Sequence, residues 1–170
     1  DWFVAHGAED IEGHGFTLLP GLVGTQSVGQ LTLRSADPFD TPLIDPACLS
    51  DEADVAVMLA GVKLARRLVR EPAFEPFRGE EYLPGEAAQT DEALIEFIRN
   101  HATTIYHPVG TCKMGLDETA VVNDKLQVHG MQGLRVADGS IMPFIVNANT
   151  NAPCIIIGEK AAELILSEQA

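Results

Sequence analysis

Leu134-Arg-Val-Ala-Asp-Gly-Ser140 is the stretch of this chain that most restricts its architecture. Its apolar first half is typical of a strand, which Asp138-Gly139 would end. In open α/β sheets, cofactors bind beyond the carboxyl ends of the strands. A glycine there lets the backbone approach a ligand closely, and a carboxylate accepts hydrogen bonds from hydroxyl groups. The stretch therefore predicts a strand over 134–137 and a cofactor contact at Asp138 and Gly139, although an ordinary Asp-Gly turn has the same residues.

The next segment, Asn147-Ala-Asn-Thr-Asn-Ala-Pro153, leads into a helix that we expect from about Pro153 to Ser167. Proline suits the first helical turn, where its missing N–H would be unpaired anyway. In an extended chain the three asparagines would project on one side. One side chain is enough to cap a helix, so the amides are either a turn with its cap or part of a binding site. A helix N-terminus also favours an anion in front of it.

Upstream lies His107-Pro-Val-Gly-Thr-Cys-Lys-Met-Gly115. A residue before proline is held in an extended backbone, and Gly110 allows a sharp turn after it. This geometry would present an imidazole from a rigid loop, which suits proton transfer near neutral pH. A single histidine beside Tyr106 is more often a hydrogen-bonded structural residue, so this motif alone does not establish a site.

The remaining elements combine antiparallel strands with helices, an α+β pattern. Alternating residues over Gly29–Ser35 predict a half-buried strand, and the prolines that follow predict turns through Ile44-Asp45-Pro46. A helix should start at Ser50 or Asp51 and end before Pro72, and a second should cover Thr90–His101. Short strands are expected at 121–122 and 126–128, with turns at Gly130 and Gly133.

Composition limits the classes of function. The 170 residues include 25 acidic and 11 basic side chains, a net charge of −14, which argues against nucleic-acid binding. Three separated cysteines without a C-x-x-C pair predict no disulfide scaffold and no metal site, and favour a reducing compartment. The uncharged, largely apolar stretch 141–158 contains two prolines and three asparagines and predicts no transmembrane helix. We expect a cytoplasmic protein, whose complete form could still associate with a membrane.

The residues of these segments, and their order, resemble the C-terminal portion of a glucose–methanol–choline (GMC) oxidoreductase. This is a family of flavin-dependent alcohol oxidases and dehydrogenases. The likeness covers nearly the whole chain and is greatest toward choline-dehydrogenase-like and other alcohol dehydrogenases. Asn123 departs from it, because the family usually has aspartate there. The segments that carry the resemblance are GQLTLRSADPFDTPLIDP (29–46), GVKLARRL (61–68), YHPVGTCKMG (106–115), LQVHGMQGLRVADGSIMP (126–143) and NTNAPCIIIGEKAAELI (149–165).

The resemblance implies a role for each site residue. His107 matches the active-site histidine, which takes the substrate hydroxyl proton or stabilises the alkoxide, and Asn149 matches the second active-site position. Asp138 and Gly139 match the pair that contacts the ribityl–pyrophosphate part of FAD. The helix-start residues match the segment near the pyrimidine edge of the flavin, where a helix N-terminus would offset the charge of the reduced ring. They are Asn151, Ala152 and Pro153.

The family's dinucleotide fingerprint, G-x-G-x-x-G after a strand, does not occur in this chain, which also begins at Asp1 without a methionine. The resemblance therefore implies that residues 1–95 are part of a substrate-binding domain. Residues 96–170 would be the last segment of a Rossmann-like FAD-binding domain, with a strand and the terminal helix. We expect a small alcohol as substrate and the missing N-terminal FAD-binding part as partner. Alone, the chain should bind FAD poorly, be inactive and self-associate.

Two other hypotheses remain at this point. The chain could be a non-catalytic fragment that only packs against its N-terminal half. It could also be a metal-dependent hydrolase, although its histidines form no H-E-x-x-H motif and no repeated i, i+4 pair. These histidines are His6, His14, His101, His107 and His129.

Overall fold

The computed structural model describes residues 13–168, which form two compact units. Unit 1 contains Ala47–Ile105 and the segment that ends at Leu22. Unit 2 contains Val23–Pro46 and the segment that begins at Tyr106. These units follow contacts within the chain. The assignment of 1–95 and 96–170 to a substrate and a flavin domain therefore stays a prediction.

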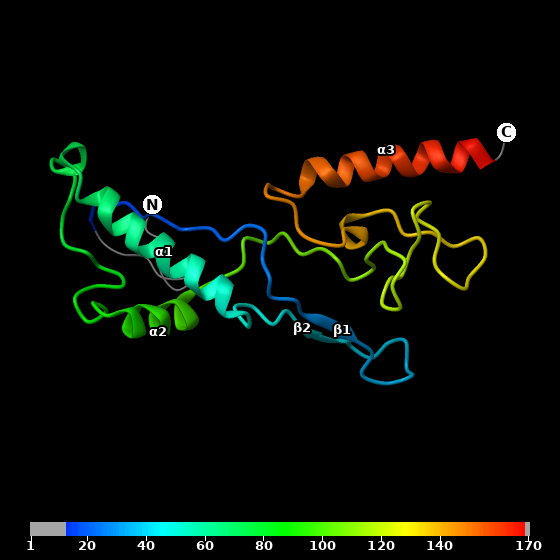
Figure 1. Cartoon of the computed structure of the whole chain (residues 1–170), viewed down its shortest axis with the longest axis horizontal. Helices are drawn as coiled ribbons and strands as arrows, with labels where there is room; N and C mark the ends of the chain where they lie inside the picture. The colour runs from blue at the N-terminus through cyan, green and yellow to red at the C-terminus, as the bar shows by residue number, and fades with distance from the viewer. Residues whose placement is uncertain (1–12, 169–170) are drawn as a thin grey trace. The chain divides into compact units, whose positions relative to one another are not determined.

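The predicted α+β class is confirmed, with short strands and three α-helices in the described part of the chain (Figure 1). Unit 1 holds the helices α1 and α2 and the 3₁₀ turn η2. Their bounds are α1 Glu52–Val69, η2 Pro72–Phe74 and α2 Asp91–His101. Unit 2 holds the strands, the 3₁₀ turn η3 and the last helix. Their bounds are β1 Gln30–Thr32, β2 Leu43–Asp45, η3 Gly139–Ile141 and α3 Asn151–Glu168.

Both helices of unit 1 begin at predicted caps. The Asp51 side chain accepts a hydrogen bond from the Ala53 N–H at 2.8 Å, and Thr90 accepts one from the Ala93 N–H at 3.2 Å. These bonds satisfy N–H groups that have no partner inside the helix. Acidic residues in the first turn and basic residues in the last complement the helix dipole of α1 and of α2. The two helices pack side by side (Figure 1).

In the sheet of unit 2, the first strand is shorter than predicted, and a second strand lies where turns were predicted. Leu31 pairs with Ile44 at the centre of an antiparallel β1–β2 ladder (Figure 1). The expected strand 29–35 is therefore shorter, and the predicted turn at Ile44-Asp45 is wrong because these residues lie in β2. The ladder explains the difference, since an extended segment pairs wherever a neighbouring strand offers its backbone groups.

The predicted strand 134–137 is also wrong in extent. Gln127 and Arg135 form one isolated antiparallel bridge, flanked by hydrogen bonds from Val128 N to Leu134 O and from Val136 N to Leu126 O. Gly130 and Gly133 both have positive φ and turn the chain between these two short segments, as predicted. The pairing stays short because the facing segment is itself only a few residues long.

The segment that turns back between Gln127 and Arg135 is called the hairpin of unit 2. The core of this unit packs the hairpin and its neighbours against the last helix. Val122 and Leu126 are buried with Ile141 of η3 and Ala161 of α3. Such a cluster removes apolar surface from water, so α3 is held by packing as well as by its own hydrogen bonds. None of the helices in residues 13–168 is long and apolar enough to cross a membrane. The cytoplasmic location stays a prediction.

Candidate functional site

The His107 loop is hydrogen-bonded to the turn that follows the Leu134 segment. Cys112 N donates to Ser140 O at 2.9 Å, and Met114 N donates to Ile141 O at 2.8 Å. Gly110 has a φ of 90°, which confirms the predicted sharp turn. Two of the three segments singled out in the sequence therefore meet through backbone contacts in unit 2.

His107 is half-buried and its ring contacts the start of α3. Its Nδ1 lies 3.0 Å from Thr150 Oγ1, and Thr150 is only 9% exposed. This hydrogen bond links two positions 43 residues apart. The Asn147–Pro153 segment thus lies beside the His107 loop. Thr150 was not among the predicted site residues, although a hydroxyl residue directly before a helix was a signal that could have identified it.

The last helix, expected from about Pro153, begins two residues earlier, at Asn151. The Cys154 N–H donates to Thr150 O at 3.0 Å, the first bond of the helix ladder. Pro153 still lies in the first turn, as predicted. The three asparagines consequently do not form one extended run, since Asn151 is helical while Asn147 and Asn149 precede the helix.

The exposed side chains at this helix start are available to a ligand. For Asn149 and Asn151, residues 13–168 provide no side-chain hydrogen-bond partner. The backbone N–H groups of Asn151 and Ala152 lie in the first turn, where a helix offers no acceptor of its own. This end of α3 can therefore receive hydrogen-bond acceptors and negative charge.

Asp138 precedes η3 as its N-cap, and its carboxyl group stays ionised at neutral pH. Its Oδ1 accepts a hydrogen bond from Ser140 N at 2.8 Å, and hydrogen bonding to Ser140 lowers the pKa of the carboxyl group. The side chain is exposed, so it can accept further hydrogen bonds. Beside it, a Cβ on Gly139 would lie 3.2 Å from Cys154 Sγ. Glycine was expected to let a ligand approach, and in the structure it lets α3 approach η3.

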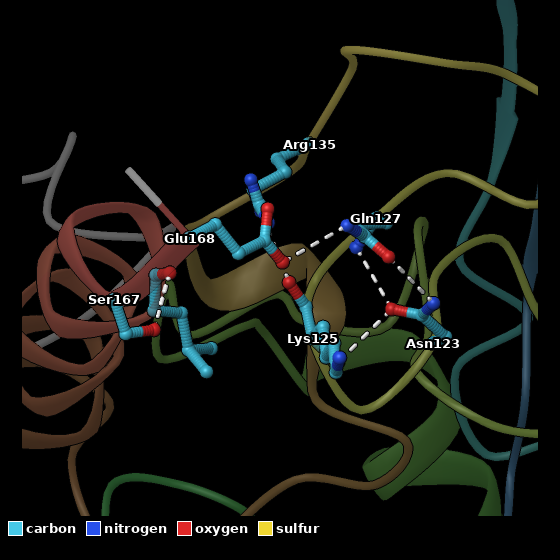
Figure 2. Close-up of polar contacts among 7 residues, drawn as sticks. Asn123, Lys125, Gln127, Arg135, Ser167 and Glu168 are labelled. Carbon is cyan, nitrogen blue, oxygen red and sulfur yellow. Dashed lines mark hydrogen bonds and ion pairs between the residues drawn. The ribbon is translucent and has the colours of Figure 1, made fainter. Parts of the chain in front are cut away.

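The other end of α3 is bound to the hairpin of unit 2 (Figure 2). Arg135 Nη2 lies 2.6 Å from Glu168 Oε2, and Gln127 Nε2 donates to Glu168 Oε1 at 3.2 Å. Asn123 Nδ2 donates to Gln127 Oε1 at 3.1 Å, so the amide of Gln127 connects Asn123 with Glu168. Asn123 Oδ1 also accepts from Lys125 N and Gln127 N. An aspartate could make the last two contacts but could not donate to Gln127.

A hollow of about 460 Å³ lies elsewhere in unit 2, between residues 24–26 and 144–147. Gly24 has a φ of 67°, and a Cβ there would lie 2.9 Å from Asn147 Oδ1. A side chain at this position would therefore collide with the asparagine. One side of the hollow is formed by the residues that precede Asn149 in the sequence. Across residues 13–168, no three His, Cys, Asp or Glu side chains are grouped closely enough to hold a metal ion.

Comparisons with known proteins identify the family of this chain. A family model described as GMC oxidoreductase matches residues 25–158. An oxygen-dependent choline dehydrogenase from Cronobacter sakazakii is 47% identical over 94% of this chain and 29% of its own length. An alcohol dehydrogenase (acceptor) from Pseudomonas putida is 46% identical over 95% of this chain and 29% of its own length. A solved FAD-dependent oxidoreductase from Chaetomium thermophilum is 29% identical, with a TM-score of 0.77 over 83% of this chain and 25% of that one.

The chain thus spans under a third of the length of these relatives. The family model covers most of the described residues and includes the His107 loop, η3 and the start of α3. The sequence resemblance is confirmed: this chain belongs to the GMC oxidoreductase family.

Proposed function

We propose that this chain is the C-terminal part of an FAD-dependent alcohol dehydrogenase or oxidase that acts on a primary alcohol, choline-like or other. The observation that carries the proposal is the 3.0 Å contact between His107 Nδ1 and Thr150 Oγ1. It puts a half-buried imidazole beside the first turn of α3, where the exposed amide of Asn149 is the neighbouring residue. The names of the choline and alcohol dehydrogenase relatives support the substrate class.

The side chains at this end of unit 2 fit a flavin dinucleotide. Asp138 is an exposed, ionised acceptor, which suits the hydroxyl groups of a ribityl chain. Asn151, Ala152 and Pro153 form a helix start, which suits an electron-rich ring edge. Gly139 adds no side chain between η3 and α3. Bound FAD would supply the hydride acceptor at N5, which no side chain of the chain can provide.

His107 would accept the hydroxyl proton as the alcohol is oxidised. A positioned general base typically contributes ~10²–10⁴-fold to the rate. Asn149 cannot ionise, so its amide would orient the substrate oxygen through a hydrogen bond. The partly buried ring of His107 limits competition from water for the proton.

The rest of the proposed enzyme lies outside this chain. Its partner would be the N-terminal FAD-binding part of the same protein, and residues 1–95 and 96–170 would contribute to the substrate and flavin domains. Exposed apolar residues on α3, among them Ile155, Ile156 and Leu166, support the need for such a partner. The chain alone would then bind FAD poorly and show no turnover.

The proposal is tested with His107→Ala in the complete polypeptide. Alcohol-dependent reduction of the flavin should fall by at least ~10²-fold while the flavin remains bound, because only the proton acceptor is removed. His129→Ala is the matched control, since His129 lies in the same unit and its ring is hydrogen-bonded to Gly115 O, away from Thr150. Unchanged alcohol oxidation in His107→Ala would show that this imidazole is not the base.

A second experiment tests whether the chain needs the N-terminal part to bind flavin and oxidise alcohol. The chain is purified alone and then mixed with the separately produced N-terminal part, and flavin content and alcohol oxidation are measured in each sample. We expect a yellow, active complex only after mixing. Stoichiometric flavin and alcohol-dependent bleaching in the chain alone would refute the need for a partner. If the continuous polypeptide is active but the mixed parts give a colourless or inactive complex, assembly from these two separate parts is refuted.

A further inference from the structure

Thr150 has a buried hydroxyl group aimed at the imidazole of His107. Thr150 is 9% exposed, and in the described part of the chain His107 Nδ1 is the partner found for its Oγ1. Among these residues the hydroxyl is hydrogen-bonded to His107 Nδ1 and not to an N–H of the first turn of α3, so it does not act as an ordinary helix cap. Its placement is therefore explained by the ring it contacts.

The backbone on both sides of this contact is held in place. The His107 loop is bound to η3 by the backbone hydrogen bonds of Cys112 and Met114. Thr150 is held by the hydrogen bond from Cys154 N to its carbonyl oxygen. The remaining freedom of His107 is rotation of its ring and exchange of the proton between Nδ1 and Nε2. A hydroxyl 3.0 Å from Nδ1 restricts both.

We propose that Thr150 is a positioning residue that accepts a hydrogen bond from His107 Nδ1–H and thereby leaves Nε2 as the proton acceptor. This inference rests on the proposed function, in which His107 is the base. A neutral imidazole carries its proton on one nitrogen only, and the bond made by that nitrogen sets which one is protonated. If Nδ1 were unprotonated, Nε2 would carry the hydrogen and could not accept the proton of an alcohol.

The test compares Thr150→Val, which keeps the shape but removes the hydroxyl, with Thr150→Ser, which keeps the hydroxyl. Both are made in the complete polypeptide. Thr119→Val serves as the matched control, because its hydroxyl lies in the same unit and bonds only the nearby Asp117 among the described residues. Two quantities are measured: the ¹⁵N shifts of the His107 ring, assigned by their loss in His107→Ala, and the rate of flavin reduction by alcohol over a range of alcohol concentrations.

We expect the wild type, Thr150→Ser and Thr119→Val to show a protonated Nδ1 and an unprotonated Nε2 in the neutral ring. Thr150→Val should lose this preference and reduce the limiting rate ~10-fold with little change in the apparent affinity for alcohol. Equal ring shifts in Thr150→Val and wild type would overturn the inference, as would an equal loss of rate in Thr150→Ser. If Thr150→Val does not fold, Thr150→Ala provides the same ring measurement.

The two proposals fail in different ways. If His107→Ala oxidises alcohol normally, the proposed function fails whatever the ring shifts are. If His107→Ala is inactive while Thr150→Val matches the wild type in both measurements, the base is retained and the positioning role of Thr150 is refuted.

Discussion

Arg135 and Glu168 form an ion pair, with 2.6 Å between Nη2 and Oε2, that binds the last turn of α3 to the hairpin of unit 2 (Figure 2). The Arg135 side chain is 19% exposed and its Nη2 is buried, so the Glu168 carboxylate compensates a charge that has little contact with water. The opposite end of α3 is bound through Thr150 and His107. The helix that carries the candidate site is therefore attached at both ends.

Removing one partner of this pair should destabilise unit 2. Glu168→Gln leaves the buried guanidinium without a counter-charge, so we expect a lower melting temperature. The matched control is Glu163→Gln, which breaks an ion pair with Lys160 on the same helix, in which both side chains are more than half exposed. That change should have little effect. Equal losses in the two variants would show that burial of Arg135 is unimportant, and thermal unfolding followed by circular dichroism distinguishes these outcomes.

The same pair predicts a dependence of stability on pH. Contact with the Arg135 guanidinium, and the charge of Lys125 in addition, holds the pKa of Glu168 below its usual 4.5. A carboxyl whose pKa is lower in the folded state stabilises the fold above about pH 4.5 and loses that contribution as pH falls through the folded pKa. The difference in unfolding free energy between wild type and Glu168→Gln should therefore shrink on acidification. A difference that stays constant from pH 7 to the acid limit would contradict this, with urea titrations at each pH as the measurement.

Asn123→Asp, which introduces the residue that the sequence resemblance implies here, should weaken the attachment of α3 in this chain. The aspartate could not donate to Gln127 Oε1, and if the Gln127 amide turned over to donate to it, Gln127 would present its oxygen to Glu168. We expect faster hydrogen exchange in the last turns of α3. Asn123→Ser offers a comparison that adds no charge, and unchanged exchange in Asn123→Asp would show that the amide chain is not what holds the helix.

Gly139→Ala should strain the contact between η3 and α3. The added Cβ would lie 3.2 Å from Cys154 Sγ, closer than ordinary van der Waals contact, and overpacking of this kind costs roughly 1–2 kcal/mol. Cys154→Ala removes the sulfur, so the double variant should recover most of that loss. A double-mutant cycle on unfolding free energies measures the coupling. Additive effects would mean that the two residues do not compete for the same space.

Gly110→Ala should also destabilise the chain, for a reason that lies in its backbone. Gly110 has a φ of 90°, and a Cβ there would lie 3.3 Å from Met142 O. A residue with a side chain loses about 1–2 kcal/mol in such a conformation. Gly79→Ala is the matched control, since Gly79 has no atom within 4 Å of a Cβ and no positive φ. Denaturant unfolding should separate the two variants, and equal stability would disprove the conformational argument.

Some features of this chain could be predicted from neighbouring residues alone. The caps Asp51 and Thr90, the turn at Gly110 and the proline in the first turn of α3 all depend on contacts within a few positions of the sequence. Such local interactions have nearly the same energy in any surrounding structure, so they can be identified without coordinates. The order of the His107, Asp138 and Asn149 segments was likewise enough to identify the family, which the comparisons confirm.

Pairing between distant segments could not be predicted in this way. A strand was predicted over 134–137, but only Arg135 forms a bridge there. A turn was predicted at Ile44, but this residue lies in β2. Both differences arise because ladder hydrogen bonds depend on which backbone segment lies opposite.

Local chemistry and the order of motifs are thus enough to specify the helices, the turns at Gly110, Gly130 and Gly133, and the family. The contact of Thr150 with His107 across 43 residues and the ion pair of Arg135 with Glu168 are visible only in the folded chain. Such contacts require the loops between the two residues to close, which costs conformational entropy. A residue pattern does not indicate for which loops the packing energy will exceed that cost.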